Sequence, residues 1–380
     1  MDEVAILEGA RTPFGRALKG SLRQTRPEDL GSAVIKATLA KASVDANEIE
    51  DLAIGCAMPE GSQGLNVARS IGFLAGLPHT VPAYTVNRFC ASGLQTIASV
   101  ASRIAIGEMK VAIAGGVESM SAVPMGGFHP QLHPTLALDY PEAYIGMGNT
   151  AENVAQQFEV SRSAQDAFAA RSQSRALAAR DSGRLAEEII AFDADVDGRA
   201  IHLEHDELIR PGTTSEGLAK LRPAFSVTGS VTAGNSSPLT DGAAAVAMCA
   251  KSQLAGRTPL GYFRRFVTVG VAPEIMGIGP VPAIEKLLGD SGLTISDIDL
   301  FEVNEAFASQ SVYCQKTLGI DDSKLNVNGG AIAIGHPLGV TGTRLVLTAL
   351  KELKRRNGRY AVVSMCIGGG MGAAALLERN

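Results

Sequence analysis

The feature that most constrains the fold is an internal repeat of one helix–turn–strand pattern. Residues 33–55 are predicted to form a helix, a turn and a short apolar strand, and residues 283–304 show the same pattern. A shift of 249 residues pairs Ile35 with Ile284. Helix and strand patterns alternate along the rest of the chain, which indicates an α/β architecture. The repeat therefore predicts two structurally related halves.

The same shift of 249 residues aligns a second block. It carries 92–116 onto 341–365, and each of these segments is typical of a helix followed by a buried strand. A third match, of 242–246 with 372–376, needs a shift of 130 residues, as if the first half held an insertion before its last strand. Helix–strand units of any α/β protein align loosely, so the alternative of a chance match stays open on this evidence alone.

The change of shift predicts where the inserted segment lies. We expect an N-terminal half at 1–117 and 239–256, an inserted loop domain at 118–238, and a C-terminal half at 257–380. The composition agrees, because the inserted segment begins with Met, Pro, His and Gly residues and then shows a long polar helix pattern between 150 and 182.

Composition excludes several function classes. With 46% hydrophobic and 19% charged residues, the 380-residue chain suits one large globular unit or two to three packed domains. A net charge of -5 and the absence of Trp argue against a nucleic-acid partner. No stretch is long enough to span a membrane. The first residues resemble no targeting peptide and the last ones no peroxisomal signal, so we expect a cytoplasmic protein.

Five cysteines are spread along the chain without any C-x-x-C pair, so we expect free thiols, no disulfide framework and no metal site. Cys90 lies at a sharp turn between a predicted strand and a predicted helix. Backbone N–H groups at a helix start favour a thiolate and can stabilise an oxyanion, as in a nucleophile elbow. A cysteine before a helix is nevertheless more often a small buried apolar residue.

His336 lies in a glycine-rich loop, which the pattern places between a short strand and a helix beginning near Thr341. A histidine in a loop is usually exposed and idle. Here the repeat aligns Gly339 with Cys90, so His336 and Cys90 belong to equivalent loops of the two halves. Pseudo-twofold packing would bring these loops together and make a Cys–His pair.

Cys366 lies between a predicted strand and a glycine-rich turn. Residues 368–373 formally match a dinucleotide-binding fingerprint, but the chain ends before a Rossmann unit would be complete, so we reject that interpretation. Backbone donors facing a reacting carbonyl are the better interpretation of the turn. Asn304 follows a predicted strand, where a helix N-cap would equally explain it. Cys56, Cys249 and Cys314 are interpreted as packing residues.

Six segments, in this order and over almost the whole chain, resemble the thiolase family: VNRFCASGLQ, AGGVESMS, VTAGNSSPLTDGAAA, EVNEAFA, NVNGGAIAIGHPLG and CIGGGMGAA. The resemblance implies a five-layered α-β-α-β-α thiolase fold of two related halves with an inserted loop domain that binds CoA. It implies thiolytic cleavage of 3-oxoacyl-CoA by CoA through an acyl-cysteine, without a metal or redox cofactor. It also implies a homodimer, often paired into a tetramer, and association with other enzymes of fatty-acid β-oxidation.

The resemblance also assigns roles to individual residues. Cys90 would accept the acyl group, His336 would activate it, and Cys366 would act as acid and base. One oxyanion hole would comprise the N–H groups of Cys90 and Gly368, and the other His336 with a water held by Asn304. CoA and acyl contacts would come from the remaining candidates, which are Arg222, Ser237, Met147 and Met276, with Arg222 suited to the CoA phosphates.

Four alternatives stand beside this function. Cys366 argues against a 3-oxoacyl-carrier-protein synthase, and the Asn304–Phe307 segment differs from that of sterol-carrier-type thiolases. Gly146 stands where biosynthetic acetoacetyl-CoA thiolases typically have His, which favours a degradative enzyme but leaves acetoacetyl-CoA thiolysis open. A non-catalytic CoA-binding scaffold would have no reason to keep both cysteines and the histidine together.

Overall fold

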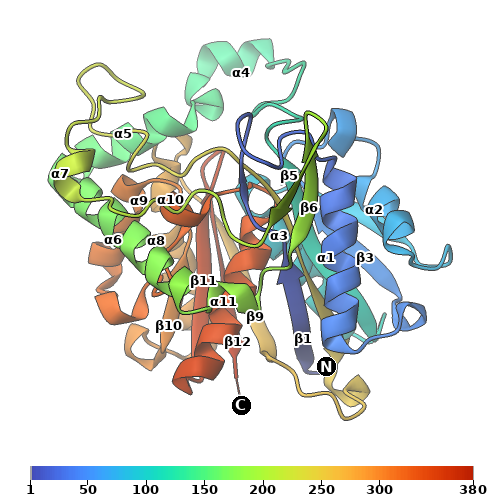
Figure 1. Cartoon of the computed structure of the whole chain (residues 1–380). Coiled ribbons are helices and arrows are strands. Elements are labelled where there is room, and N and C mark those ends of the chain that lie inside the picture. Colours follow the sequence, from blue (N-terminus) through green and yellow to red (C-terminus); the bar gives the residue numbers. More distant parts are fainter. Residues whose placement is uncertain (1, 380) are drawn as a thin grey trace.

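The computed structural model describes residues 2–379 and shows one large mixed β-sheet covered by helices (Figure 1). In the N-terminal half the strand order is β4-β3-β5-β8-β1, with β8 antiparallel to both of its neighbours. The bounds of these strands are β1 Val4–Arg11, β3 Asp51–Gly55, β4 Ala83–Val86, β5 Val111–Ser119 and β8 Thr240–Ala250, with the short β2, Gly15–Arg16, paired to β8.

The C-terminal half repeats this order as β10-β11-β12-β9. The strands are β9 Gly261–Gly270, β10 Leu300–Val303, β11 Tyr360–Ile367 and β12 Met371–Glu378. In the N-terminal half, β4 pairs in parallel with β3 at the edge of the sheet. At the equivalent edge of the C-terminal half, the described residues form only a single parallel bridge, between Phe301 of β10 and Leu325. Strands β1 and β9 pair antiparallel and join the two halves into a continuous sheet. The predicted duplication is therefore visible in the topology.

The helices form three layers, and the two halves of the sheet lie between them as two further layers, which is the five-layered arrangement that the family resemblance implied (Figure 1). Helices α3 and α11 pack against each other and against strands of both halves, at the centre of the largest apolar cluster. One outer layer, α1 and α2, covers the N-terminal strands, and the other, α8 and α9, covers the C-terminal strands. Their bounds are α1 Pro27–Ala42, α2 Val67–Ala75, α3 Ser92–Ala105, α8 Pro280–Ser291, α9 Ala308–Leu318 and α11 Thr341–Arg356.

The small side chains of the central strands explain how closely these layers approach. All eleven residues of β8 are buried, and six of them are alanine or glycine. A strand covered on both faces by helices reads as a continuous apolar run rather than an alternating one. Gly116 of β5 shows the limit, because a Cβ there would lie 2.0 Å from the carbonyl oxygen of Gly339. The sheet of one half thus touches the loop of the other directly.

The segment between β5 and β8 contains four helices and a hairpin. They are α4 Pro134–Asp139, α5 Met147–Gln157, α6 Arg162–Asp181, α7 Ser215–Leu218 and the strands β6 Phe192–Val196 and β7 Arg199–Leu203. Helix α6 packs against α9 and α10 (Ala331–Ile334) of the C-terminal half. Strand β5 extends to Ser119, so Glu118 belongs to the sheet rather than to the inserted segment.

Two local expectations were wrong. The residues before His336 form the short helix α10 instead of a strand, because Gly330 and Gly335 bracket four buried residues and Gly335 has a φ of 111° that ends the helix. Asn304 is not a helix N-cap, because α9 begins only at Ala308, after a stretch of extended backbone. Within residues 2–379, no helix is long and apolar enough to cross a membrane.

Candidate active site

Cys90 lies in a strained turn directly before α3. The single 3-10 turn Phe89–Ala91 connects β4 to α3, and Phe89 has a φ of 45°, which is uncommon for a bulky residue. Ser92 fixes this turn, since its hydroxyl donates to the carbonyl of Phe89 (2.7 Å) and accepts from the N–H of Arg88 (2.8 Å). The predicted strand, turn and helix are all present, and they place Cys90 beside the first turn of the central helix.

Two backbone N–H groups lower the pKa of the Cys90 thiol, those of Cys90 itself and of Gly368. They belong to different halves of the molecule, and they are the pair that the family resemblance implied for an oxyanion hole. Burial raises the pKa of the Cys90 thiol to about 11, although both N–H groups lower it. The N–H groups thus act in the direction that the sequence predicted. Desolvation outweighs the two donors, so the group is a thiol until a base removes its proton.

His336 is buried and held in one tautomer. The Thr341 hydroxyl donates to the carbonyl of Pro337 (3.0 Å), so it accepts from Nδ1–H of His336 (2.6 Å). Nε2 is then the basic nitrogen, and Asn304 Nδ2 donates to it at 3.3 Å. Burial, reinforced by the charge of Arg344, lowers the pKa of His336 to about 3. The imidazole is therefore neutral and able to accept a proton.

Asn304 places a free acceptor in the same site. Its N–H donates to the carbonyl of Ser364 (2.9 Å), which anchors it at the end of β10 against β11. Its side-chain Oδ1 is fully buried and has no hydrogen-bond partner among the described residues. A buried amide oxygen without a partner favours a bound donor such as a water molecule. This is the position at which the sequence predicted a water.

Cys366 lies at the end of β11 without any exposed surface. Burial raises the pKa of its thiol well above the ordinary value, and the nearby Cys90 sulfur raises it further. The side chain packs in a small apolar cluster with Met276, Ala306 and Phe307, and Met147 packs against the same cluster. The two cysteines and two of the four predicted pocket residues therefore meet in one place.

The residues predicted to contact CoA and the acyl group divide into those near the two cysteines and Arg222, which is exposed. Met147 lies close to Gly368, where an added Cβ would be 3.4 Å from the Met147 sulfur. The hydroxyl and the N–H of Ser237 both donate to the carbonyl of Ala306, at 2.9 and 3.0 Å. Arg222 instead lies on an exposed part of the inserted segment, and no hydrogen bond or ion pair of its side chain occurs within residues 2–379.

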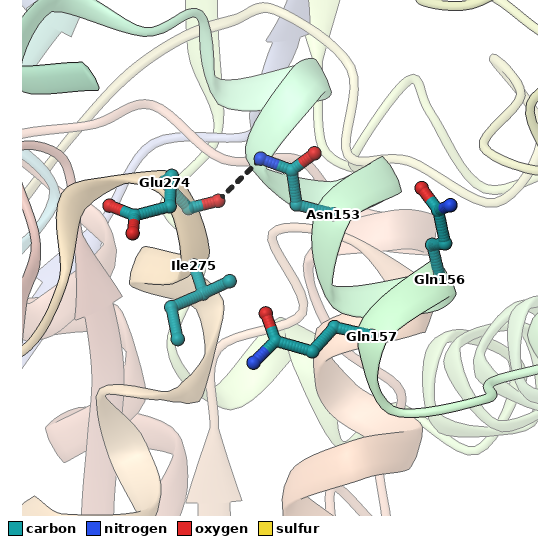
Figure 2. A pocket seen from close by; sticks show the side chains of 5 residues that line it. All are labelled: Asn153, Gln156, Gln157, Glu274 and Ile275. Atoms are coloured by element: carbon teal, nitrogen blue, oxygen red, sulfur yellow. Dashed lines mark hydrogen bonds between the residues drawn. The ribbon is translucent and has the colours of Figure 1, made fainter.

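A cavity of 310 Å³ lies between α5 and the 3-10 segment Pro273–Ile278, lined by Asn153, Gln156, Gln157, Glu274 and Ile275 (Figure 2). It contains none of the predicted site residues. Asn153 Nδ2 donates to the carbonyl of Glu274 (2.9 Å) and ties the two segments together (Figure 2). These segments carry Met147 and Met276, so the contact fixes two sides of the predicted pocket.

Sequence reasoning missed three residues around this site. Thr341 sets the tautomer of His336, and the fully buried Arg344 pairs with Glu302 at 3.4 Å beneath it. Glu118 lies within a segment that carried the family resemblance, but no role followed from its position there. The role of a buried carboxylate depends on its hydrogen-bond donors, and those of Glu118 come from distant parts of the chain, Ala57 and Gly339 among them. Among residues 2–379, no group of three or more His, Cys, Asp or Glu side chains is arranged to hold a metal ion.

Comparisons with known proteins define the class. The thiolase N-terminal domain model matches residues 4–252 and the thiolase C-terminal domain model matches residues 257–379. The chain therefore belongs to the thiolase family.

Particular relatives refine this assignment. A 3-ketoacyl-CoA thiolase of Bacillus subtilis (strain 168) is 54% identical, with 100% of both chains covered. The peroxisomal 3-ketoacyl-CoA thiolase B of Mus musculus is 48% identical over 99% of this chain and 91% of that protein. The crystal structure of the Bacillus anthracis acetyl-CoA acetyltransferase superimposes with a TM-score of 0.92 at 37% identity, covering 100% of this chain and 99% of that one.

Proposed function

We propose that this chain cleaves 3-oxoacyl-CoA with CoA, giving acetyl-CoA and an acyl-CoA shortened by two carbons. The observation that carries the proposal is the convergence on Cys90 of two N–H donors, from Cys90 itself and Gly368, next to the second thiol of Cys366. A thiol nucleophile, a donor pair for a carbonyl oxygen and a separate proton donor are the groups that carbon–carbon cleavage of a 3-oxo thioester requires.

In the first half-reaction, His336 Nε2 takes the proton of Cys90 and the thiolate attacks the 3-oxo carbon. The oxygen that becomes negative accepts hydrogen bonds from the N–H groups of Cys90 and Gly368. The bond between C2 and C3 then breaks. The acyl group stays on Cys90, and the departing acetyl-CoA enolate takes the proton of Cys366. Its oxygen is stabilised by the protonated His336 and a water held by Asn304.

In the second half-reaction, the Cys366 thiolate removes the proton of an incoming CoA thiol. The CoA thiolate attacks the acyl carbon on Cys90 and forms the shortened acyl-CoA. Cys90 leaves as a thiolate and recovers its proton from His336, so both cysteines and the histidine return to their starting states. The residues on this chain supply every proton transfer, and we propose that no metal or redox cofactor takes part.

CoA binding belongs mainly to the inserted segment in this proposal. Met147 and Ser237 of that segment border the apolar cluster around Cys366, which also contains Met276 of the C-terminal half, and these residues fit the acyl and pantetheine portions. Arg222 is exposed on the same segment, where a guanidinium group suits the CoA phosphates. The inserted segment would thus bind the phosphate end of CoA at the protein surface and direct the thioester end toward Cys90 and Cys366.

The assembly and location of the protein are further parts of the proposal. Strand β4 is an edge strand, and exposed Leu65, Phe73 and Leu74 lie on and before the neighbouring α2. An uncovered edge next to apolar side chains favours a second copy of the chain, so we propose a homodimer, with a dimer of dimers as the larger form. We also propose a cytoplasmic enzyme that works beside other β-oxidation enzymes.

The alternative substrate is acetoacetyl-CoA, and the likeness to a solved acetyl-CoA acetyltransferase favours it. Steady-state thiolysis across 3-oxoacyl-CoA lengths from four carbons upward separates the two. A rising or flat kcat/KM with length supports the broader activity, and activity confined to four carbons supports the alternative. Binding of CoA without cleavage of any length would instead support a non-catalytic scaffold.

A further inference from the structure

We propose that Glu118 is a positioning residue, whose buried carboxylate holds the loop that carries His336 against the half that carries Cys90. The inference rests on the proposed function, since it concerns the alignment of the proposed base with the proposed nucleophile. Glu118 lies near the end of β5 and only 1% of its surface is exposed.

Donors from separate parts of the chain surround this carboxylate. Oε2 accepts from the N–H of Ala57 and from the N–H of Gly339, both at 2.8 Å. Oε1 accepts from the N–H of Met58 (3.2 Å) and from Gln63 Nε2 (3.0 Å). The thiol of Cys56 donates weakly to the same oxygen at 3.7 Å. No cation pairs with Glu118 among residues 2–379, so these donors alone stabilise the charge.

Gly339 is the contact that crosses between the halves. It lies in the turn of residues 337–340, and a Cβ on it would lie 2.8 Å from both the Cys56 Cα and the Gly55 oxygen. Just before this turn the N–H of His336 donates to the Thr240 hydroxyl (3.1 Å). The loop that carries the base is therefore anchored at both points by the N-terminal half, on β5 and on β8.

The charge of Glu118 also reaches the nucleophile. Burial is the main cause of the raised pKa of Cys90, and the charge of Glu118 raises that pKa further. The other titratable groups of this region are the imidazole of His336, the thiol of Cys366, which borders Cys90, and that of Cys56. Burial raises the pKa of Glu118 itself, and its backbone and Gln63 donors lower it. Glu118 thus combines two effects that substitutions can separate, its reach to Gly339 and its negative charge.

Two substitutions at this position and one control test the inference. Glu118→Gln keeps the shape but replaces one acceptor oxygen by an NH2 group where every neighbour is a donor, so the side chain can no longer hold both sets of donors and the link to Gly339 should weaken. Misplacing a reacting group by about 1 Å can cost about 100-fold in rate, and we expect kcat to fall by about that factor with KM changed less than about twofold. Glu118→Asp keeps the charge but shortens the reach, and we expect a loss of about tenfold.

The control is Asp241→Asn, which removes a buried carboxylate paired in register with Ser119. The partners of Asp241 lie on residues 119–121 and not on the His336 loop. We expect its kcat to stay within about threefold of wild type. If Glu118→Gln loses no more kcat than Asp241→Asn, the inference is overturned. If Glu118→Gln shows no cooperative thermal unfolding, Glu118→Asp decides, and an unchanged kcat there overturns it.

A second readout needs no substrate. The pH dependence of Cys90 alkylation by iodoacetamide should shift to lower pH in Glu118→Gln, because a charge that raises the thiol pKa is gone, and should stay in place in Glu118→Asp and Asp241→Asn. An unshifted profile in Glu118→Gln contradicts the charge effect. Inactivity of the wild-type protein toward every 3-oxoacyl-CoA would instead remove the proposed function, and the alkylation result would still report on Glu118.

Discussion

The loops before α3 and α11 occupy equivalent places in the two halves but differ in the residues they present and in how deeply they are buried. Both helices begin at residues related by the same shift of 249, Ser92 and Thr341. The loop before α3 presents Cys90, which is 6% exposed and is preceded by the half-exposed Phe89 in a left-handed conformation. The loop before α11 is buried throughout, and Gly339 takes the place of Cys90.

The difference shows how a duplicated fold can divide one reaction. Two equivalent helix starts face each other in the middle layer, so groups placed on them meet. In the first loop, the strained backbone of Phe89 places the thiol of Cys90 where the proposed substrate would bind. The second has no room for a side chain at Gly339, but it brings His336 to the site three residues earlier. One half thus supplies the proposed nucleophile and the other the proposed base and the second thiol.

The largest effects should come from separating the two thiols. Cys90→Ala should lower turnover by about 10⁴-fold or more and abolish acetyl labelling of the residue 90 peptide by acetyl-CoA, since no other group is placed to accept an acyl group. Cys366→Ala should also lose carbon–carbon cleavage but keep the acetyl label on Cys90, seen by peptide mass. Near-normal thiolysis by Cys366→Ala would mean that another group protonates the enolate.

Gly339→Ala tests whether the second loop tolerates the side chain that the first one carries. The new Cβ would meet the backbone of Gly55 and Cys56 at 2.8 Å, so we expect a destabilisation of about 2 kcal/mol and a loss of kcat of about 100-fold. Gly289→Ala is the matched control, because it lies in α8 with nothing within 4 Å, and it should be neutral or slightly stabilising. Thermal unfolding with steady-state rates tests both.

Alkylation should distinguish Cys90 from the other four thiols. Cys90 is 6% exposed while Cys56, Cys249 and Cys366 are fully buried, so iodoacetamide should modify Cys90 first and abolish activity in step. The rate should rise with pH up to about 11, the pKa of the buried thiol. Peptide mapping after brief treatment is the measurement. First modification of Cys56 or Cys314 with activity retained would show that the nucleophile is another residue.

Arg222 lies outside both loops and should affect binding rather than chemistry. Arg222→Ala should raise the apparent KM for CoA by about three- to tenfold with kcat nearly unchanged, because it would remove only the proposed contacts with the CoA phosphates. Arg210→Ala provides a comparison at another exposed arginine of the inserted segment. An unchanged KM in Arg222→Ala would remove this residue from the CoA site.

The smallest effect is expected for pH, because His336 of the second loop should not titrate between about pH 7 and pH 5. The folded pKa of His336 is lowered to about 3, so the imidazole is a neutral base at every pH above that value. Between pH 7 and pH 5, kcat/KM should therefore show no loss with an apparent pKa near the ordinary value of about 6.5. A fall centred there would show that His336 is protonated over this range and that burial does not control it.

Much of this arrangement follows from sequence pattern. The fixed shift of 249 residues predicted the equivalence of the two loops. The pattern could not predict that α10 is a helix, because its four buried apolar residues suit either structure and tertiary packing decides. It also could not predict the resting state of Cys90. The balance between N–H donors and desolvation depends on burial, which a single sequence does not report.

Strand β8 lies between β1 and β5, although residues 120–239 separate it from β5 in the chain. The sheet of the first half therefore lacks a central member until Ala250 has left the ribosome, after about two-thirds of synthesis. Until then, β1 and β5 each lack the strand that pairs with them on one side, while the whole inserted segment is synthesised. Such long-range pairing is slow and leaves apolar strands open to aggregation. We therefore expect the nascent chain to depend on chaperones most strongly during that interval.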